Sequence, residues 1–548
     1  MKSQHALPVY SLLIIVAIVS VFVGLSSCQP ASPTEAPAAP EQSEATAPEP
    51  TTLTEDQEQT PTPEPSPTPT PPQALTIGLG RDLYDGPGTW YFLHGSLGVW
   101  EPLVILDNDM VAQPVLATSW EPNEDGTVWT FSLREGVTFH DGTPFDADAV
   151  LLNIPMLQEE YMTTLPNLDS LDKVDVHTVA FLMEQPTPNL PQLIAYFSSA
   201  MLSPGAVGED GRLTAPVGTG PFIFVEYIED DSIVLRRNDD YWGEPAKLAE
   251  VTFKVIPDAS TRLAALQAGD IDAIADVGSL QPEQASVIQA DDNLLLFEQG
   301  VATTHYLTFN SGKPPFDDGR LRQAVSRAID RQGLVDSTLY GFGGPGVSVI
   351  TPHATQWVHT DIAPSYDLDG ARSLASEALD GERVEVRLVL NAGLLGRWPY
   401  ENISQILQAT LADMGIDVQI HTLEGGAWNE ALRDGDYDLT MMPYTLMTGD
   451  PDFFMGRWVW SEGDMNQRRS YGYANERADE LVLAAQSEMD TDQRRALYLK
   501  LQEIVAEDVP FTPLYHETTI YAARKNVQGL RLDVQFKPSI EQAYLSTE

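Results

Sequence analysis

Residues 113–150, QPVLATSWEPNEDGTVWTFSLREGVTFHDGTPFDADAV, decide how the remainder of the chain is interpreted. After a helix-like opening and a turn at residues 123–126, apolar and polar side chains alternate over residues 127–133. A period of two is typical of a strand with one buried face, and here that face includes Trp129 and Phe131. The segment therefore predicts a strand that packs aromatic side chains into a core.

Two turns and a helix start follow this strand. Glu135-Gly136 predicts a tight return into a second short strand at residues 137–139, and residues 141–144, DGTP, predict another turn. Asp146 and Asp148 favour a helix N-terminus, because acidic side chains interact well with the positive end of the helix dipole. The stretch is thus predicted to form a compact β-β-α unit.

The motifs in this stretch are similar to those of a known family. Residues 129–137, WTFSLREGV, and the turn at residues 139–142, FHDG, resemble the signature of family 5, the peptide/nickel class of bacterial solute-binding proteins of ABC importers. Three further blocks agree with this family, namely WEPL at residues 100–103, GTGPF at 218–222 and NDDYWG at 238–243. The resemblance covers residues 74–548. It implies an α/β, two-lobed periplasmic-binding-protein-like fold of type II, with an extra small domain and with the lobes joined by a hinge.

The resemblance also implies a division of the chain. We expect a signal peptide at residues 1–27, followed at 28–73 by a lipidated cysteine and a disordered Pro/Thr/Glu-rich tether. The first large lobe is expected in three pieces, at residues 74–105, 213–308 and 518–548, the small extra lobe at 106–212 and the other large lobe at 309–517.

Local patterns predict α/β structure in both large lobes. Residues 250–256, 260–268 and 271–274 have the strand, helix and strand patterns of a β-α-β crossover, with Gly269 ending the helix. Strands predicted at residues 384–390, 416–420 and 436–442, with a helix at 401–414, indicate a second sheet. Asp490 and Gln493 predict the start of a later helix, since their spacing is that of a capping box.

The N-terminal region predicts export and anchoring. Residues 11–25 form an apolar run of signal-peptide length, and Leu25-Ser26-Ser27-Cys28 resembles a lipobox, in which the cysteine becomes the lipidated first residue. Cys28 is the only cysteine, so no disulfide can form within the chain. The alternative is an uncleaved anchor helix, and with either one the protein lies outside the cytoplasm. Residues 29–72 lack the apolar side chains needed for a core and are expected to act as a tether.

The charge balance excludes some partners. The formal net charge is −49, and the acidic residues are spread along the whole chain. Such a surface repels nucleic acid phosphates and anionic lipid headgroups. A generic acidic, salt-adapted surface is favoured over an acidic binding site.

The loop at residues 444–452, YTLMTGDPD, is where a ligand would be distinguished. Peptide-binding members of the family commonly hold the peptide amino terminus with an aspartate just before an Asp-Pro pair, and a charged residue often lies on the preceding strand. The resemblance places these positions at Met447 and Met441, which cannot pair with a charged terminus. A shifted Asp450 is a possible substitute. The alternative is that both methionines are core residues.

The candidate ligand-binding residues combine this loop with aromatic side chains from other segments. They are Trp90, His94, Tyr306, Trp398, Met441, Tyr444, Met447 and Asp450. The family implies an oligopeptide solute that is delivered to an ABC permease with its ATPase subunits by a monomeric receptor. An oligosaccharide stacked on aromatic rings is the alternative solute, and a nickel chelate is a remote third.

Catalysis and cofactor binding are not expected. No nucleophile-and-base motif or paired-carboxylate motif is recognisable, although a lipid-anchored hydrolase and a surface adhesin remain alternative classes. The glycines at residues 341–346 lack the following lysine and serine of a phosphate-binding loop, and His353 and His359 lack a third metal ligand nearby. We therefore predict a binding protein without metal or cofactor.

Overall fold

The computed structural model describes residues 73–83, 97–160, 165, 167–195, 200–209 and 213–546. These residues belong to one compact unit, Thr70–Glu548. The predicted signal peptide, Cys28, the tether, Trp90 and His94 lie outside the described residues. Among the helices of the described part, none combines the length and apolar character that a membrane crossing requires.

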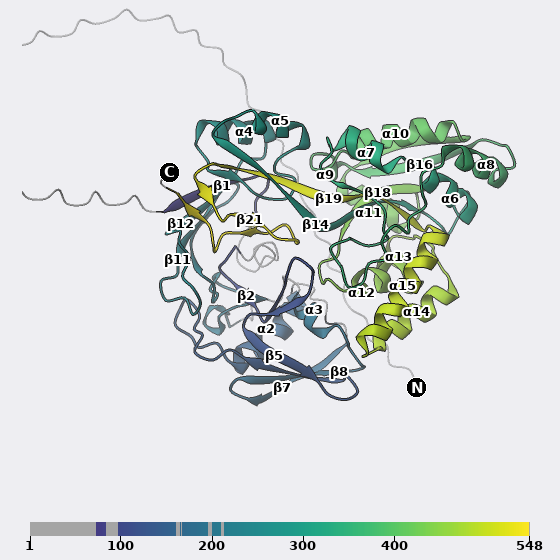
Figure 1. The fold of residues 1–548 in the computed structure, drawn as a ribbon. Coiled ribbons are helices and arrows are strands. Elements are labelled where there is room, and N and C mark those ends of the chain that lie inside the picture. Colours follow the sequence, from purple (N-terminus) through teal and green to yellow (C-terminus); the bar gives the residue numbers. More distant parts are fainter. Residues whose placement is uncertain are drawn as a thin grey trace, which may run out of the picture. The chain divides into compact units, whose positions relative to one another are not determined.

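A mixed sheet of eleven strands forms the centre of this unit (Figure 1). Its order is β10-β11-β12-β1-β13-β19-β14-β18-β16-β17, and β15 pairs with β19 beside this path. The strands are β1 (Ala74–Leu79), β10 (Phe222–Ile228), β11 (Ser232–Arg237), β12 (Glu250–Val255), β13 (Ala273–Ile274), β14 (Leu294–Phe309), β15 (Gly344–Pro345), β16 (Val384–Asn391), β17 (Ile416–Leu423), β18 (Leu439–Thr445) and β19 (Phe511–Arg524).

The first half of the sheet contains the predicted β-α-β crossover. β1 is parallel to both β12 and β13, and α4 (Ala259–Ala268) connects the latter two. The side chain of Asp258 caps the helix by accepting from the Thr261 amide. Gly269 ends it with φ +85°, a left-handed conformation that favours glycine. These elements confirm the predicted crossover. The sequence could predict the helix because the residues that start and end it lie within or next to it.

Two long antiparallel strands run through both halves of the sheet. β14 and β19 pair from Leu294 with Arg524 to Thr308 with Phe511. Near one end β19 pairs with β13 of the first half, whereas at the other end β14 pairs with β18 of the second half. Leu307, Phe309 and Met441 pack in one hydrophobic cluster of the second half, whereas the cluster around Ile77 continues from the first half into the second, as far as Val389 and Met442. This arrangement is the two-lobed α/β fold that the resemblance implied.

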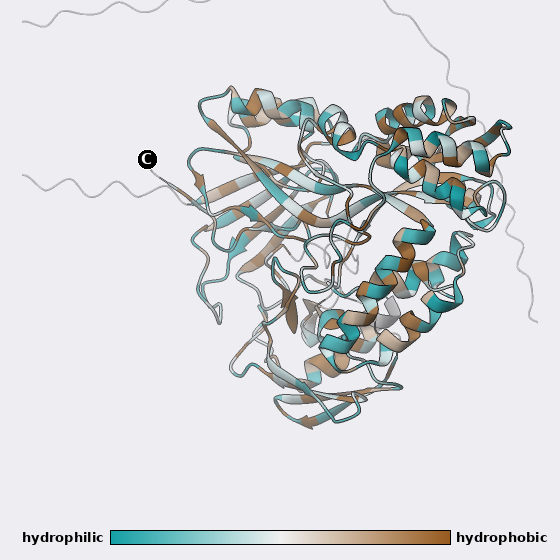
Figure 2. Ribbon diagram, turned by 45° about the vertical axis from the view of Figure 1, so that its right-hand side comes forward, coloured by the Kyte–Doolittle hydropathy of each residue, from teal (hydrophilic) through white to brown (hydrophobic). Residues whose placement is uncertain are grey.

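The second half has parallel strands with helices packed against them. β16 and β17 are parallel, and α10 (Tyr400–Ala412) lies between them in the chain. β18 begins at Leu439, three residues later than the pattern predicted. α15 (Thr491–Asp508) is capped by Asp490, whose side chain accepts from the Gln493 amide, as predicted. Helices here show both hydrophilic and hydrophobic residues along their length, as expected for elements with one buried face (Figure 2).

The stretch at residues 113–150 belongs to a separate four-stranded sheet, of order β5-β6-β8-β7. Its strands are β5 (Ala117–Pro122), β6 (Val128–Leu133), β7 (Leu168–Asp175) and β8 (Thr178–Met183). Trp129 and Phe131 are buried as predicted, with Phe131 5.0 Å from the Phe181 ring. The acid-started helix is also present as α2 (Ala147–Glu160).

Two predictions in this stretch are wrong. The helix-like opening is strand, because β5 pairs along β6 and this tertiary pairing overrides the local preference. The second strand at residues 137–139 is absent, and a single bridge joins Thr138 to Pro144. The turn at Asp141-Gly142 follows so soon after Thr138 that the two segments on either side of it cannot form more than one bridge.

The remaining elements cover and connect these sheets. Short strand pairs are β2 (Glu101–Pro102) with β9 (Ala200–Met201), β3 (Val104–Leu106) with β4 (Ala112–Pro114), β20 (Val527–Gln528) with β23 (Tyr544–Leu545) and β21 (Arg531–Leu532) with β22 (Pro538–Ser539). Further helices are α3 (Leu190–Ile194), α5 (Ala285–Gln289), α6 (Gly319–Arg327), α7 (Arg331–Thr338), α8 (Leu368–Ala378), α9 (Ala392–Leu395), α11 (Gly425–Arg433), α12 (Asp452–Phe454), α13 (Asp464–Arg468) and α14 (Glu476–Ser487), with short helices at Pro204–Ala206, Pro282–Gln284 and Met455–Val459.

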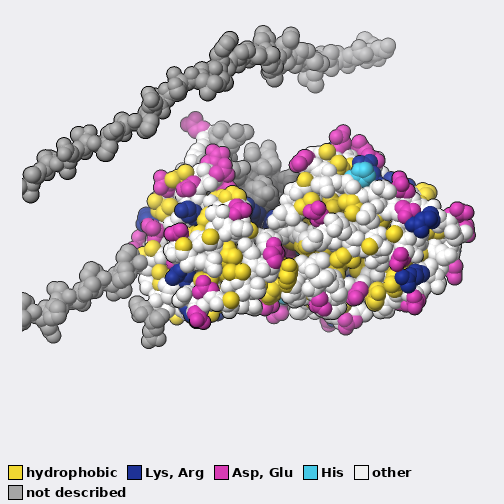
Figure 3. All heavy atoms as spheres, turned by 90° about the horizontal axis from the view of Figure 1, so that it is seen from above, with side chains coloured by type: hydrophobic (Ala, Val, Ile, Leu, Met, Phe, Trp, Pro, Cys, Tyr) yellow, Lys and Arg dark blue, Asp and Glu magenta, His cyan; other side chains and the backbone are white. Residues whose placement is uncertain are grey.

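Acidic side chains are scattered over the face seen in Figure 3 and do not gather in one patch. This distribution agrees with a generally acidic surface. An acidic binding site would concentrate the carboxylates.

Candidate functional site

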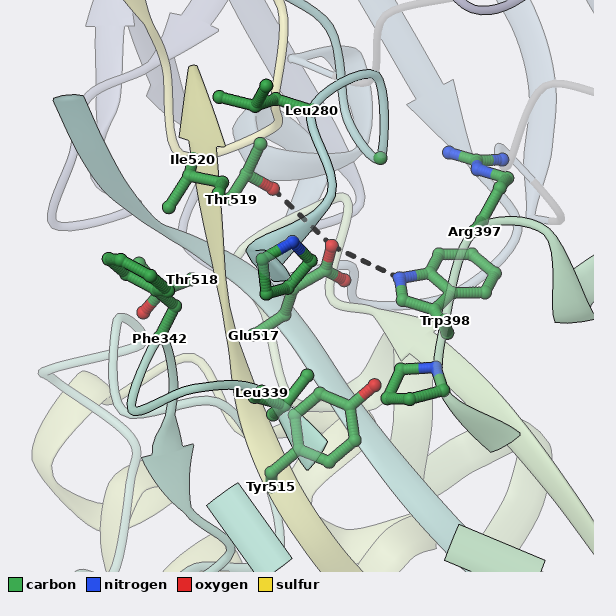
Figure 4. Close-up of a pocket in the computed structure, with 13 residues that line it drawn as sticks. Leu280, Leu339, Phe342, Arg397, Trp398, Tyr515, Glu517, Thr518, Thr519 and Ile520 are labelled. Atoms are coloured by element: carbon green, nitrogen blue, oxygen red, sulfur yellow. Dashed lines mark hydrogen bonds between the residues drawn. The ribbon is translucent and has the colours of Figure 1, made fainter. Parts of the chain in front are cut away.

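A small pocket lies where the two halves of the large sheet meet (Figure 4). Gly278 and Leu280 line it from the loop after β13, Arg397 and Trp398 line it from the connection between α9 and α10, and residues 517–520 line it from β19. Its volume is about 40 Å³, enough for a few water molecules. A group held here touches both lobes at once.

Glu517 of β19 is the acidic residue in the wall of this pocket. Its side chain is 8 % exposed and accepts three hydrogen bonds. His305 Nε2 lies 3.0 Å from Oε2, whereas Trp398 Nε1 and Thr519 Oγ1 lie 3.2 Å and 3.4 Å from Oε1. Burial by itself raises the pKa of Glu517, but the His305 and Trp398 contacts and nearby Arg397 outweigh burial and lower it. The carboxylate is therefore ionised at neutral pH.

His305 of β14 orients the carboxylate. The ring is fully buried, stacks on Tyr515 at 4.1 Å, and has Nδ1 2.6 Å from the Tyr400 hydroxyl. Burial lowers the pKa of His305 more than Glu517 raises it, so the imidazole is neutral. With one ring proton, the arrangement is satisfied when Nε2–H donates to Glu517 and Nδ1 accepts from Tyr400.

Arg397 links this pocket to a second one. Its guanidinium lies 4.6 Å from the centre of the Trp398 ring, and its side chain lies against Gly278. Gly278 has φ +67°, a left-handed conformation that favours glycine, and an added Cβ would stand at an ordinary contact distance of 3.4 Å from Arg397. Gly278 and Arg397 also line a neighbouring cavity of about 90 Å³.

The neighbouring cavity has a basic wall. Arg81 and Arg262 line it together with Arg397, and the acidic residue among its lining residues is Asp276. Asp276 is buried and pairs with Arg81 through contacts of 3.0 Å and 3.1 Å. Arg262 donates to the carbonyls of Pro257 and Ser279, which fixes its guanidinium in the wall.

Of the residues predicted from the sequence, Trp398 lies in the pocket between the halves. Tyr306 is buried, donates to the Val349 carbonyl at 2.7 Å and stacks on Phe454. Tyr444 packs against Phe454 and Trp458, and its hydroxyl bonds to the Phe453 carbonyl. These two tyrosines belong to an internal aromatic cluster, away from the pocket-lining residues.

The methionines of the predicted site are also internal. Met441 has no exposed surface and lies in the core of the second half, whereas Met447 is 7 % exposed and lies in the other core. The backbone carbonyl of Met447 accepts from Gln535 Nε2 at 2.6 Å. Neither side chain lines the pocket described above.

Asp450 is fully buried and already paired. Both carboxylate oxygens contact the guanidinium of Arg494, with Nη2 2.8 Å from Oδ1, and Asn189 Nδ2 lies 3.2 Å from the same oxygen. Burial alone would lower the pKa of Arg494, but attraction from Asp450 outweighs burial and raises it. Asp450 thus links α15 and Asn189 to the loop at residues 444–452.

The sequence analysis did not identify Glu517 or Arg397 as residues that line the pocket. The available signal for Glu517 was one acidic residue in a strand whose other side chains are mostly apolar or hydroxylated, PLYHETTIYAA at residues 513–523. A buried carboxylate in such a strand needs hydrogen-bond donors, and those donors come from distant parts of the chain.

The fold and the pocket between two lobes are those of receptors that close around a solute. Residues 111–466 match the model of bacterial extracellular solute-binding proteins, family 5, and the chain belongs to this family. The resemblance found in the sequence is thereby confirmed, and the protein is an extracytoplasmic solute-binding protein.

Two relatives illustrate the similarity in sequence. The chain is 29% identical over 464 residues to di/tripeptide-binding protein 1 of Pseudomonas aeruginosa, covering 76% of this chain and 83% of the relative. It is 29% identical over 456 residues to the dipeptide-binding protein of Escherichia coli, covering 77% and 84%.

Solved structures share the fold. NikA from Brucella suis, in complex with Fe(III)-EDTA, is 25% identical with a TM-score of 0.78, covering 86% of this chain and 100% of that one. A dipeptide-binding protein from a Pseudoalteromonas species, in complex with Met-Leu, is 22% identical with a TM-score of 0.73, with the same coverage. The solutes in these structures differ widely, so the fold by itself does not select a ligand.

Proposed function

We propose that this solute-binding protein captures a short peptide between its two large lobes and delivers it to an ABC permease with its ATPase subunits. The observation that supports this most directly is the pocket at the meeting of the two lobes, in which Trp398 and Arg397 from one lobe face Gly278 and Leu280 from the other. Relatives that bind dipeptides, tripeptides and glutathione by name support the peptide as solute.

Charge favours a peptide over an oligosaccharide. The Arg397 guanidinium at the pocket is suited to a peptide carboxylate, because guanidinium and carboxylate form strong paired hydrogen bonds. A sugar would need an open aromatic face, whereas the Trp398 ring is covered by Arg397 and packed edge-on against His305. Tyr444 is likewise packed within its own aromatic cluster.

Solute entry requires the lobes to move apart. The pocket volume of about 40 Å³ suits a single small group and is too small for a whole dipeptide. β14 and β19 pass between the halves and are suited to act as hinges, with lobe boundaries near residues 309 and 517. A peptide that contacts both lobes binds the closed form more tightly than the open form, and so it would shift the equilibrium towards the closed form.

Binding and closure are tested together. The full chain, purified in detergent, is titrated by calorimetry with dipeptides, tripeptides and oligosaccharides, and its radius of gyration is measured by X-ray scattering with and without each solute. We expect heat and compaction with peptides. Binding of an oligosaccharide without any binding of peptide would contradict the peptide assignment, and turnover of a bound solute would contradict a transport role.

Lipid anchoring at Cys28 is a separate proposal. The apolar run at residues 11–25 and the following Leu25-Ser26-Ser27-Cys28 motif support it, together with the absence of other cysteines from the sequence. Lipidation would hold the receptor at the membrane in which its permease resides.

A further inference from the structure

The carboxylates of the loop at residues 444–452 are engaged by other side chains of the protein. Asp450 is fully buried and engaged by Arg494 and Asn189, while Asp452 is half-buried and accepts from Gln486 at 3.0 Å. Met447, at the position where the family resemblance implied an aspartate, packs in the core. A peptide amine bound by this protein therefore needs its negative partner on another element.

Glu517 has the charge and the position for that role. Among the described residues that line the pocket between the lobes, Glu517 is the acidic one. The hydrogen bonds that it accepts come from His305, Trp398 and Thr519. His305 is neutral, so the hydrogen bonds to the carboxylate come from neutral donors. The charge of Arg397 in the same wall lowers the pKa of Glu517, but among the described residues no lysine or arginine forms a salt bridge with it.

A buried carboxylate with neutral hydrogen-bond donors, and with a guanidinium nearby but not within salt-bridge distance, is only partly compensated. Burial of a charge is costly unless an opposite charge accompanies it, and neutral donors offset this cost only in part. The two contacts to Oε1 are long, at 3.2 Å and 3.4 Å, whereas Oε2 is held by His305 at 3.0 Å. Oε1 is therefore the oxygen at which a cation can gain most.

We propose that Glu517 binds the protonated amine of the solute, which is the α-ammonium group of a short peptide. This inference rests on the proposed function and names its amine-binding group. The pocket volume of about 40 Å³ accommodates an ammonium group, which is close to a water molecule in size. Tyr515 and Phe342 line the same space, and aromatic rings are favourable neighbours for a cation (Figure 4).

The position of Glu517 also orients the solute. Gly278 and Arg397 line both this pocket and the larger neighbouring cavity, whose wall includes Arg81 and Arg262. With its amine at Glu517, a peptide extends past Arg397 towards the basic wall, where its carboxylate meets positive charge. The opposite orientation would place a carboxylate against Glu517 and is excluded by like-charge repulsion.

The test compares free and blocked amines. The full chain in detergent is titrated with a panel of dipeptides and tripeptides, with the N-acetylated form of each, and with putrescine. We expect free peptides to bind at least about 30-fold more tightly than their acetylated forms, since a hydrogen bond to a charged partner is worth a factor of about 10 to 100. In Glu517→Gln this ratio should fall below about 3.

Two variants separate charge recognition from folding. Glu517→Asp retains the charge and should retain a reduced preference for the free amine. Glu101→Gln is the matched control, because Glu101 is also buried and accepts from three side chains, those of Thr219, Tyr241 and Trp242, but does not line the pocket. It should keep the wild-type ratio even if its melting temperature falls. If Glu517→Gln does not fold, Glu517→Asp must still lower the ratio of the affinities for free and acetylated peptides below that of wild type.

The outcomes distinguish this inference from the proposed function. If peptides bind but the ratio is the same in wild type and in the Glu517 variants, peptide capture stands and the amine assignment is overturned. If no peptide binds but putrescine binds in a Glu517-dependent manner, the amine site stands and the peptide assignment fails. If neither free peptides nor putrescine bind, the amine assignment is overturned.

Discussion

Asp450→Asn should strongly destabilise the protein without acting on a solute directly. Asp450 is fully buried and contacts the Arg494 guanidinium through both oxygens, and Arg494 is itself 3 % exposed. The asparagine leaves this guanidinium without its counter-charge. The substitution also weakens the contact of Asn189 with the loop.

The expected loss in the free energy of unfolding is large because the ion pair of Asp450 with Arg494 is buried. Removing one partner of a buried ion pair costs about 3 to 5 kcal/mol, because the remaining charge stays in a poorly solvated site. Asp417→Asn is the matched control, since Asp417 pairs with Arg383 where the two side chains are 43 % and 58 % exposed. An exposed pair contributes about 1 kcal/mol or less. The two aspartate variants should thus differ by several-fold in their effect on the free energy of unfolding.

Urea unfolding of the full chain, followed by circular dichroism, measures this difference. Since a multi-lobed chain can unfold in steps, hydrogen exchange over residues 444–452 and 491–508 should report the local change. The double variant Asp450→Asn with Arg494→Met should be less destabilised than the sum of the single variants, because it removes the isolated charge. A loss equal to that of Asp417→Asn, or weaker peptide binding at unchanged stability, would refute the structural role.

Three further changes test other parts of the structure. Burial, and then the negative charge of Asp450, raise the pKa of Asp452 to about 6 from its ordinary 3.8, so the free energy of unfolding should fall by about 3 kcal/mol as pH rises from about 4 to about 6. Asp452→Asn should lack this part of the pH dependence. If the free energy of unfolding, measured in urea, changed with pH equally in the variant and in wild type, this expectation would be contradicted. Cys28→Ser should release the protein from the membrane fraction, whereas unchanged retention would argue against lipidation. Met447→Asp buries an unpaired charge, so it should lower the melting temperature without strengthening peptide binding in calorimetry; a gain in affinity would place Met447 at the solute.

Part of the candidate site was accessible from sequence. Trp398 was identified as a candidate, and it does line the pocket between the lobes. Tyr306 and the two methionines have the residue types of a binding surface but are buried among other side chains, and Tyr444 is partly buried against the same aromatic cluster as Tyr306. Aromatic and methionine side chains serve equally well in a core and in a ligand pocket, so residue type alone does not separate these uses.

The sequence by itself determined the family, the β6 strand with its buried aromatic residues, and helices such as α4 and α15 whose capping residues lie within a few positions. These features depend on local periodicity and on side chains that bond to their own helix ends.

Only the tertiary structure decided the pocket between the two halves of the large sheet. His305 and Glu517 are 212 positions apart, and Trp398 and Glu517 are 119 apart, so their contacts depend on the register of β14 with β19 and on the loop before α10. It also decided that β5 is a strand, since its hydrogen bonds are made with β6. Long-range pairing sets which polar groups meet in a buried site, and no local pattern encodes that pairing.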